Sequence, residues 1–279
     1  MLAMKKLSLS KAIGNIKLQK PFQALVDEGS FYLKIEAYVP QLCLAIHQGH
    51  RFAAKLQEKC ALNDYERWYE EDPFTLDFIA EQPMVLAGCD SRYAYDLNRS
   101  PEEAIYDTAW GKKVWSEPLT EKERNQSLKK HHNFYLLIEA LIKQLNRNYT
   151  TLVVFDMHSF NYLRMPKAAP DFNLGTVLVK KTTFRPRVEQ WLNLLRKIDL
   201  PEHTLWVAEN DVFVGDGYLA EYLNSHFSHV LVLVTEIKKI YVNELTGEAF
   251  EPIIDALVNQ FNRLIGQFSL DVGKDKGLE

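Results

Sequence analysis

Residues 152–159 read LVVFDMHS, a short apolar run that is followed at once by Asp156, His158 and Ser159. Four other runs, at residues 42–46, 84–87, 204–208 and 230–234, are also short, continuous and apolar. Runs of this kind predict strands that are buried on both faces, because a strand with one face in water alternates apolar and polar residues.

Helical periodicity fills the segments between these runs. It is clearest over residues 121–146, where leucines recur at spacings of three and four, and where Thr120 with Glu123 predicts a capping box. Further helices are expected over residues 187–197, 218–226 and 252–268. Strands that alternate with helices predict an α/β fold with a mostly parallel or mixed central sheet and helices on both faces.

The chain has 279 residues, with no internal repeat, no Gly/Ser-rich linker and no block of like charge. We therefore expect a single α/β domain over residues 1–270, followed by a tail, 271–279, whose composition is typical of disorder. Two long polar stretches, 57–83 and 100–118, are expected to be insertions between core elements.

Composition and charge disfavour several classes of protein. The formal net charge of −4 gives no basic surface for nucleic acid or an anionic membrane, and the aliphatic runs are too short to span a bilayer. The three cysteines show no C-x-x-C spacing, which favours the cytoplasm over a disulfide scaffold or a cysteine zinc site. We expect a small-molecule partner. The oligomeric state does not follow from the sequence, because no heptad run or exposed apolar stripe stands out.

Histidine and carboxylate side chains follow three of the predicted strands. His47 and His50 follow the run at 42–46, His158 follows the run at 152–155, and Glu236 follows the run at 230–234. Because the site of an open α/β sheet lies at the carboxyl ends of its strands, these side chains should meet in one crevice. Imidazole and carboxylate are the usual ligands of a catalytic zinc ion, so the pattern predicts a zinc site. The other histidines are interpreted as structural or solvated: His131, His132, His203, His226 and His229.

The segment DSRYAYDLNR at residues 90–99 follows the predicted strand 84–87. Two arginines with an asparagine are suited to hold a carboxylate, because the guanidinium fork matches carboxylate geometry. The alternative is a surface cluster of ion pairs, with Asp90 against Arg92 and Asp96 against Arg99. The loops at 171–176 and 209–217 have the composition of turns.

Taken together, these motifs resemble the N-formylglutamate amidohydrolase family over about residues 40–245. The matching residues are His47-x-Gly49, Glu71-Asp72, Ser91-Arg92, DLNR at 96–99, DxHS at 156–159, DFNLGT at 171–176, Phe213-x-Gly215 and Glu236. That family is in turn similar to the zinc carboxypeptidase and aspartoacylase group, which implies an α/β sheet between helices with the metal at the strand ends.

The resemblance implies a set of zinc ligands. His47 and His158 would be the histidine ligands of one zinc ion per chain, and Asp72 would be the acidic ligand. Two alternatives stay open at this position, Glu71 as the acid and His50 as a replacement for it.

The resemblance also implies the residues that act on the substrate. Glu236 would be the general base, and Arg92 would polarise the acyl carbonyl and stabilise the oxyanion. Asn98 and Arg99 would hold the carboxylate of the amino acid, and Asn173 would also contact the substrate.

The activity implied is zinc-dependent hydrolysis of the amide bond of an N-acyl amino acid, such as N-formylglutamate to formate and glutamate. The alternatives are a zinc carboxypeptidase or another N-acyl amino acid deacylase, and a metal- or metabolite-binding homologue without catalysis. Two departures bear on the substrate: Tyr135 stands where the family commonly has a histidine, and Gly215-Asp216-Gly217 replaces a Gly-Gly pair.

Overall fold

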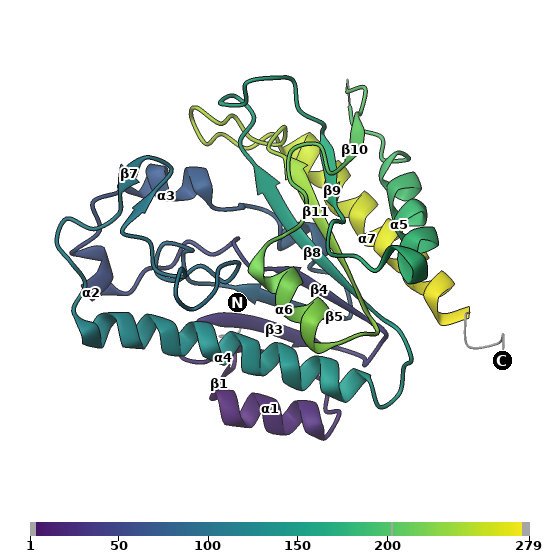
Figure 1. Ribbon diagram of the computed structural model, residues 1–279, viewed down its shortest axis with the longest axis horizontal. Helices are drawn as coiled ribbons and strands as arrows, with labels where there is room; N and C mark the ends of the chain where they lie inside the picture. The colour runs from purple at the N-terminus through teal and green to yellow at the C-terminus, as the bar shows by residue number, and fades with distance from the viewer. Residues whose placement is uncertain (1–3, 202, 275–279) are drawn as a thin grey trace.

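The computed structural model describes residues 4–201 and 203–274, and a nine-stranded mixed sheet lies at its centre (Figure 1). The strand order is β1-β2-β3-β5-β4-β8-β11-β9-β10. Its middle, β5-β4-β8-β11, is parallel, whereas β3 and β9 run antiparallel to their neighbours β5 and β11. The strands are β1 (Lys6–Leu7), β2 (Phe22–Val26), β3 (Phe31–Ile35), β4 (Gln41–Ala45), β5 (Met84–Gly88), β8 (Leu152–Phe160), β9 (Phe172–Gly175), β10 (Val207–Glu209) and β11 (Val230–Lys238), with β6 (Thr108–Ala109) and β7 (Lys112–Lys113) as a separate hairpin.

Helices cover both faces of this sheet (Figure 1). Buried side chains of α1, α4 and α6 pack on one face, and those of α5, α7 and the 3-10 helix η1 pack on the other. The helices are α1 (Leu9–Lys17), α2 (Ala54–Gln57), α3 (Asp64–Glu70), η1 (Asp77–Ile79), α4 (Glu121–Leu145), α5 (Lys181–Leu195), α6 (Tyr218–His226) and α7 (Glu251–Lys274).

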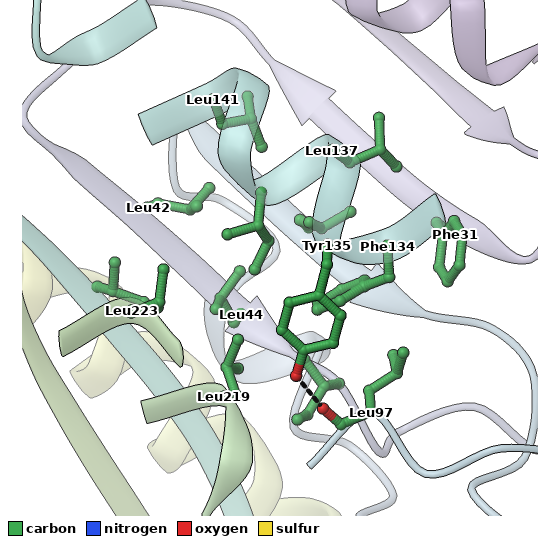
Figure 2. Packing of buried hydrophobic residues seen from close by; sticks show 14 of the residues in the cluster. Phe31, Leu42, Leu44, Leu97, Phe134, Tyr135, Leu137, Leu141, Leu219 and Leu223 are labelled. Atoms are coloured by element: carbon green, nitrogen blue, oxygen red, sulfur yellow. Dashed lines mark hydrogen bonds between the residues drawn. The ribbon is translucent and has the colours of Figure 1, made fainter. Parts of the chain in front are cut away.

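Strand β4 shows why the predicted runs are continuously apolar. Leu42 and Leu44 belong to the core under α4 and α6, and Figure 2 shows them against Leu141 and Leu223. Cys43 and Ala45, which alternate with them along the strand, belong to the core under α5 and α7. Successive side chains therefore enter opposite cores. The α/β fold with helices on both faces is confirmed.

Three helices begin at or next to their predicted starts. The capping box of α4 is present, since Thr120 accepts a hydrogen bond from Glu123 N–H and the Glu123 carboxylate accepts one from Thr120 N–H. Helix α6 has the predicted bounds, whereas α7 begins one residue before the predicted start and continues six residues past the predicted end, to Lys274. Residues 271–274 of the expected tail lie in α7, and 275–279 lie outside the described residues.

Two strands are longer than predicted, and this changes where the polar residues lie. The prediction ended β8 at Phe155, but the strand continues to Phe160, and β11 continues to Lys238. His158 and Glu236 therefore lie within neighbouring parallel strands, directly paired in register. The apolar pattern of β8 and β11 ends before the strands do, because one face of each strand borders a cavity there. The backbone hydrogen bonds of the sheet continue beyond that point.

Other elements were not predicted. The hairpin β2–β3, joined through Asp27, Glu28 and Gly29 at positive φ, extends the sheet. The segment 172–175, which has the composition of a turn, forms strand β9 instead, because its backbone pairs with β11. Among the described residues, no helix is both long enough and apolar enough to pass through a membrane.

Candidate metal and hydrolytic site

A cavity of about 370 Å³ lies at the carboxyl ends of the central strands. His47 comes from the loop after β4, whereas His158 and Glu236 come from β8 and β11. Arg92 and Asn98 enter from the long loop after β5. The expectation that residues after separate strands meet in one crevice holds in this geometry, although two of them lie inside the strands.

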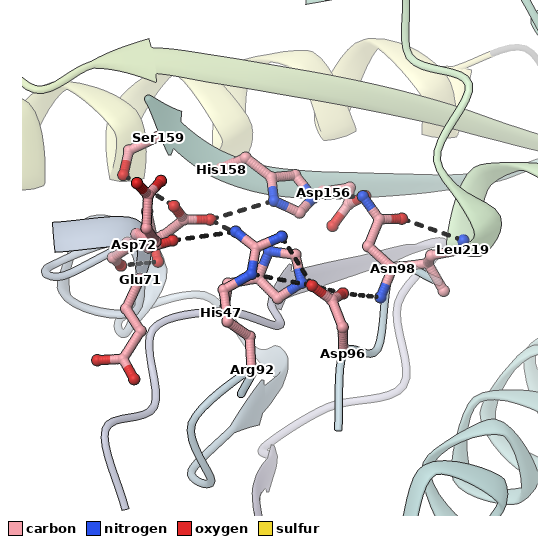
Figure 3. Close-up of polar contacts among 12 residues, drawn as sticks. His47, Glu71, Asp72, Arg92, Asp96, Asn98, Asp156, His158, Ser159 and Leu219 are labelled. Atoms are coloured by element: carbon pink, nitrogen blue, oxygen red, sulfur yellow. Dashed lines mark hydrogen bonds and ion pairs between the residues drawn. The ribbon is translucent and has the colours of Figure 1, made fainter. Parts of the chain in front are cut away.

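His47, Asp72 and His158 form the buried group whose ligand atoms lie within 4.8 Å of one another, the one such group among the described residues. The Nδ1 atoms of both histidines face the same carboxylate oxygen, Oδ2 of Asp72, at 3.4 Å from His47 and 3.2 Å from His158 (Figure 3). Each of the three side chains is almost completely buried. Their donor atoms therefore converge on one point, as a metal site requires.

Two further carboxylates orient the imidazole rings from behind. Nε2 of His47 lies 2.8 Å from Oδ1 of Asp96, and Nε2 of His158 lies 3.0 Å from Oδ2 of Asp156 (Figure 3). The contact between His47 and Asp96 is a hydrogen bond, and a proton on Nε2 of His47 that is shared with this carboxylate leaves a lone pair on Nδ1. In His47 that Nδ1 atom is buried and has no hydrogen-bond partner among the described residues. A lone pair of this kind is what a metal ion would use.

Asp72 is held in place although it lies outside any helix or strand. Its backbone N–H donates to the His47 carbonyl over 3.0 Å, and the Ser159 hydroxyl donates to its Oδ1 over 3.2 Å. Burial alone would raise the pKa of Asp72, but contacts with His158 and His47 outweigh burial and hold this pKa well below its usual range. Asp72 is therefore a carboxylate, the form that binds a metal.

Lys239 fixes the backbone that leads into Asp72. Its buried ammonium donates to the carbonyl oxygens of Tyr69 and Glu71 over 2.6 and 2.7 Å. These carbonyls lie at the C-terminal end of α3, where a positive charge is favourable. Because Lys239 directly follows β11, it ties the Asp72 segment to the strand that carries Glu236.

The two alternative ligands bond to each other outside this group. Nδ1 of His50 lies 2.5 Å from Oε2 of Glu71, and the His50 side chain is about two-fifths exposed. Neither residue belongs to the buried group of His47, Asp72 and His158. The geometry favours Asp72 over both alternatives.

Glu236 lies beside His158 on the cavity wall and bonds to no other side chain among the described residues. Burial raises the pKa of Glu236 to about 8; His158 acts against this rise, and the carboxylates of Asp72 and Asp156 add to it. A positive charge held by the nearby ligand group lowers this pKa, because it favours the charged form of the carboxyl.

Arg92 is held rigidly over the cavity. Its Nε and Nη2 bond to Oδ2 of Asp96 over 2.9 and 2.8 Å, and its Nη1 donates to the Glu70 carbonyl over 3.0 Å. The ring of Trp110 lies 5.0 Å from the guanidinium carbon. The expected surface pairs are therefore not the ones that form: Asp96 pairs with Arg92, and Asp90 pairs with Arg51 and Lys130.

The three residues expected to contact substrate differ in their placement. Asn98 and Arg99 line the cavity, and Oδ1 of Asn98 accepts from the Leu219 N–H over 3.2 Å at the start of α6. Asn173 is fully buried in β9; its amide donates to the Phe213 carbonyl and accepts from two backbone N–H groups of the same loop. In this geometry Asn173 supports the loop that forms the cavity wall, and its contact with substrate stays a prediction.

Sequence reasoning assigned no role to three residues of this site. Asp156 lies two positions before His158, and Asp96 lies four after Arg92, so both belong to quoted motifs without revealing their partners. Lys239 belongs to no recognised motif. Its side chain is buried, and a buried lysine ammonium needs hydrogen-bond acceptors. Only the tertiary fold brings the partners together.

The chain was compared with known proteins. The family model of N-formylglutamate amidohydrolase matches residues 39–242. The crystal structure of N-formylglutamate amidohydrolase from Ralstonia eutropha JMP134 is 19% identical, covers 88% of this chain and 99% of that one, and has a TM-score of 0.73. A gene product from Agrobacterium tumefaciens is 16% identical, with 88% and 94% covered and a TM-score of 0.65. A metallo-carboxypeptidase from Burkholderia cenocepacia is 13% identical, with 93% and 67% covered and a TM-score of 0.41. A comparison with curated proteins gave no match.

The two structures with the higher TM-scores share the fold of this chain over most of its length. The family match covers well over half of the sequence and includes every residue of the ligand group as well as Arg92 and Glu236. The chain therefore belongs to the N-formylglutamate amidohydrolase family, whose members are hydrolases acting on amide bonds.

Proposed function

We propose that this protein is a zinc-dependent amidohydrolase that cleaves the amide bond of an N-acyl amino acid, with N-formyl amino acids as the substrate type. One observation carries the proposal: the converging donor atoms of His47, Asp72 and His158 share a cavity with the unpaired carboxylate of Glu236. Ligand atoms beside an unpaired carboxylate are the arrangement that hydrolysis by an activated water requires.

The ligand group fits zinc. Two imidazole nitrogens and one carboxylate are the donor set of many catalytic zinc sites, and the buried Nδ1 of His47 lacks any other partner among the described residues. When bound, zinc supplies positive charge that polarises the acyl carbonyl and lowers the pKa of a water molecule. Asp96 and Asp156 fix the tautomer and direction of the two rings.

The remaining residues divide the other tasks. The Glu236 carboxylate takes the proton of the attacking water and returns it to the nitrogen of the leaving amine. The N–H groups of Arg92 that face away from Asp96 and Glu70 donate to the oxygen on which negative charge develops. Arg99 and Asn98 bind the carboxylate of the amino acid, which keeps the amide bond beside Glu236.

The proposed function is tested by metal analysis followed by an activity assay on the same sample. We expect about one zinc ion per chain after loading and dialysis, and release of free amine from N-formyl amino acids. Mass spectrometry of the metal and a fluorogenic amine assay measure the two quantities. Protein that binds no zinc even after loading would contradict the proposal.

A further prediction concerns Asp96, which orients His47. We expect Asp96→Asn to weaken zinc binding by roughly tenfold to a hundredfold, because the amide carries no charge to hold the Nε2 proton of His47. Competition with a chromogenic chelator measures the affinity. The control is Asp107→Asn, an exposed carboxylate that pairs with Arg124 on the surface. Equal zinc affinity of the two variants would refute the role given to Asp96.

A further inference from the structure

The cavity contains three arginines, and two of them already have carboxylate partners. Arg92 bonds to Asp96 and to the Glu70 carbonyl. Arg164 grips both oxygens of the Glu70 carboxylate, with Nη1 at 2.5 Å and Nη2 at 2.8 Å. Arg99 makes no ion pair with any described residue, and its guanidinium hydrogen-bonds to the Tyr106 hydroxyl. The cavity therefore offers a substrate one guanidinium that no carboxylate of the described residues occupies.

The pair between Arg164 and Glu70 is costly to break. The Glu70 side chain is buried, and its other close contact is the Asn161 amide at 3.5 Å. A ligand carboxylate that took Arg164 would leave a buried carboxylate without its cation, which costs more than the new contact gains. Arg164 is therefore a poor second site for an anionic ligand.

The outer wall of the cavity carries further negative charge. Glu103, Asp216 and Glu221 line it, each is exposed, and none pairs with a lysine or arginine of the described chain. Two aromatic side chains line the same cavity, with Trp110 and Phe213 exposed by 39% and 37%. Anionic and aromatic walls repel a carboxylate and accept neutral or cationic groups.

We infer, on the basis of the proposed function, that the substrate carries a single carboxylate: an N-acyl amino acid whose side chain is neutral or cationic rather than acidic. Arg99 with Asn98 takes the one carboxylate, and the side chain extends toward the aromatic and acidic wall. The substrate class thus differs from the dicarboxylate after which the family is described.

The comparison that decides this uses N-formylglutamate, N-formylglutamine and N-formyllysine with the zinc-loaded protein. Glutamine has nearly the shape of glutamate without its charge, so the ratio of their kcat/KM values isolates the charge. We expect about tenfold or greater preference for N-formylglutamine over N-formylglutamate, since each exposed charge contact changes binding by roughly 1.5-fold to fivefold. N-formyllysine should equal or exceed N-formylglutamine, and added salt should reduce the differences.

A charge variant locates the cause of the preference. Glu221→Gln should improve N-formylglutamate relative to N-formylglutamine by a few fold, because it removes one repelling charge. Glu58→Gln, an exposed carboxylate at the end of α2 that does not line the cavity, should leave the ratio unchanged. Preference for N-formylglutamate, or equal rates, would overturn the inference while supporting the proposed function. Failure to hydrolyse any of the three compounds would overturn the proposed function, and the inference with it.

Discussion

Replacing His158 by alanine is expected to remove zinc and activity together. His158 Nδ1 is one of the three converging donors, and Asp72 and His47 alone leave a site with two ligands. We expect zinc affinity to fall by more than about a hundredfold, since loss of a ligand exceeds the effect of losing a residue that only orients one. Hydrolysis of the N-formyl substrates should fall below detection in the same samples.

Additional variants of His158 and a control distinguish loss of the metal site from loss of the fold. His158 is buried between the carboxylates of Asp72 and Asp156, so its removal leaves two buried negative charges with fewer partners. His158→Gln, which keeps more of the side-chain volume, and circular dichroism of both variants test folding. His132→Ala, an exposed histidine of α4, is the control. A folded His158→Ala protein with zinc bound as in the unaltered chain would refute the ligand assignment.

Sequence patterns predicted the central strands because burial on two faces leaves a clear trace. From Leu42 to Ala45, each residue of β4 enters one of two cores, so the run is continuously apolar and ends close to where the strand ends. The same rule ended β8 too early, because beyond Phe155 the strand borders the cavity and carries polar side chains. The polar side chains beyond Phe155 reflect the cavity that they face, whereas the backbone remains a strand.

The residues of the candidate site could be predicted to different degrees, because some of them follow buried apolar strands and others do not. His47 and His158 follow apolar runs that place them at the carboxyl edge of the sheet, so their meeting could be inferred. Asp72 lies between a short helix and a turn, and its place depends on the Lys239 contacts to the backbone carbonyls before it. Those contacts join segments about 170 residues apart, and no local pattern reports them.

Individual contacts favour one of the alternative ligands that the sequence left open. Glu71 and Asp72 are adjacent and chemically similar, but at the end of α3 they point to different partners, His50 and the ligand group. The resemblance of this chain to a family gives the order of its motifs. The direction in which a side chain points after the end of a helix depends instead on the local backbone conformation. This is why the acidic ligand could be narrowed to two residues and no further.

Glu236→Gln is expected to abolish turnover while zinc stays bound. The amide has the shape of the carboxylate but cannot accept the proton of the attacking water, so we expect kcat to fall by roughly a hundredfold to ten-thousandfold. Zinc content should match that of the unaltered protein, because Glu236 is not one of the three converging donors. Loss of activity with retained zinc separates a proton-transfer role from a ligand role.

The control for this variant is Glu139→Gln on α4, a partly buried glutamate that pairs with Lys143 and Tyr222 and does not line the cavity. It should keep both zinc and turnover. Near-normal turnover by Glu236→Gln would refute the assignment of the base, and loss of zinc would make Glu236 a ligand. The two variants separate metal binding from proton transfer, since His158→Ala should lose both zinc and activity and Glu236→Gln should lose activity alone. If both variants kept zinc and lost only activity, a different set of ligands would be required.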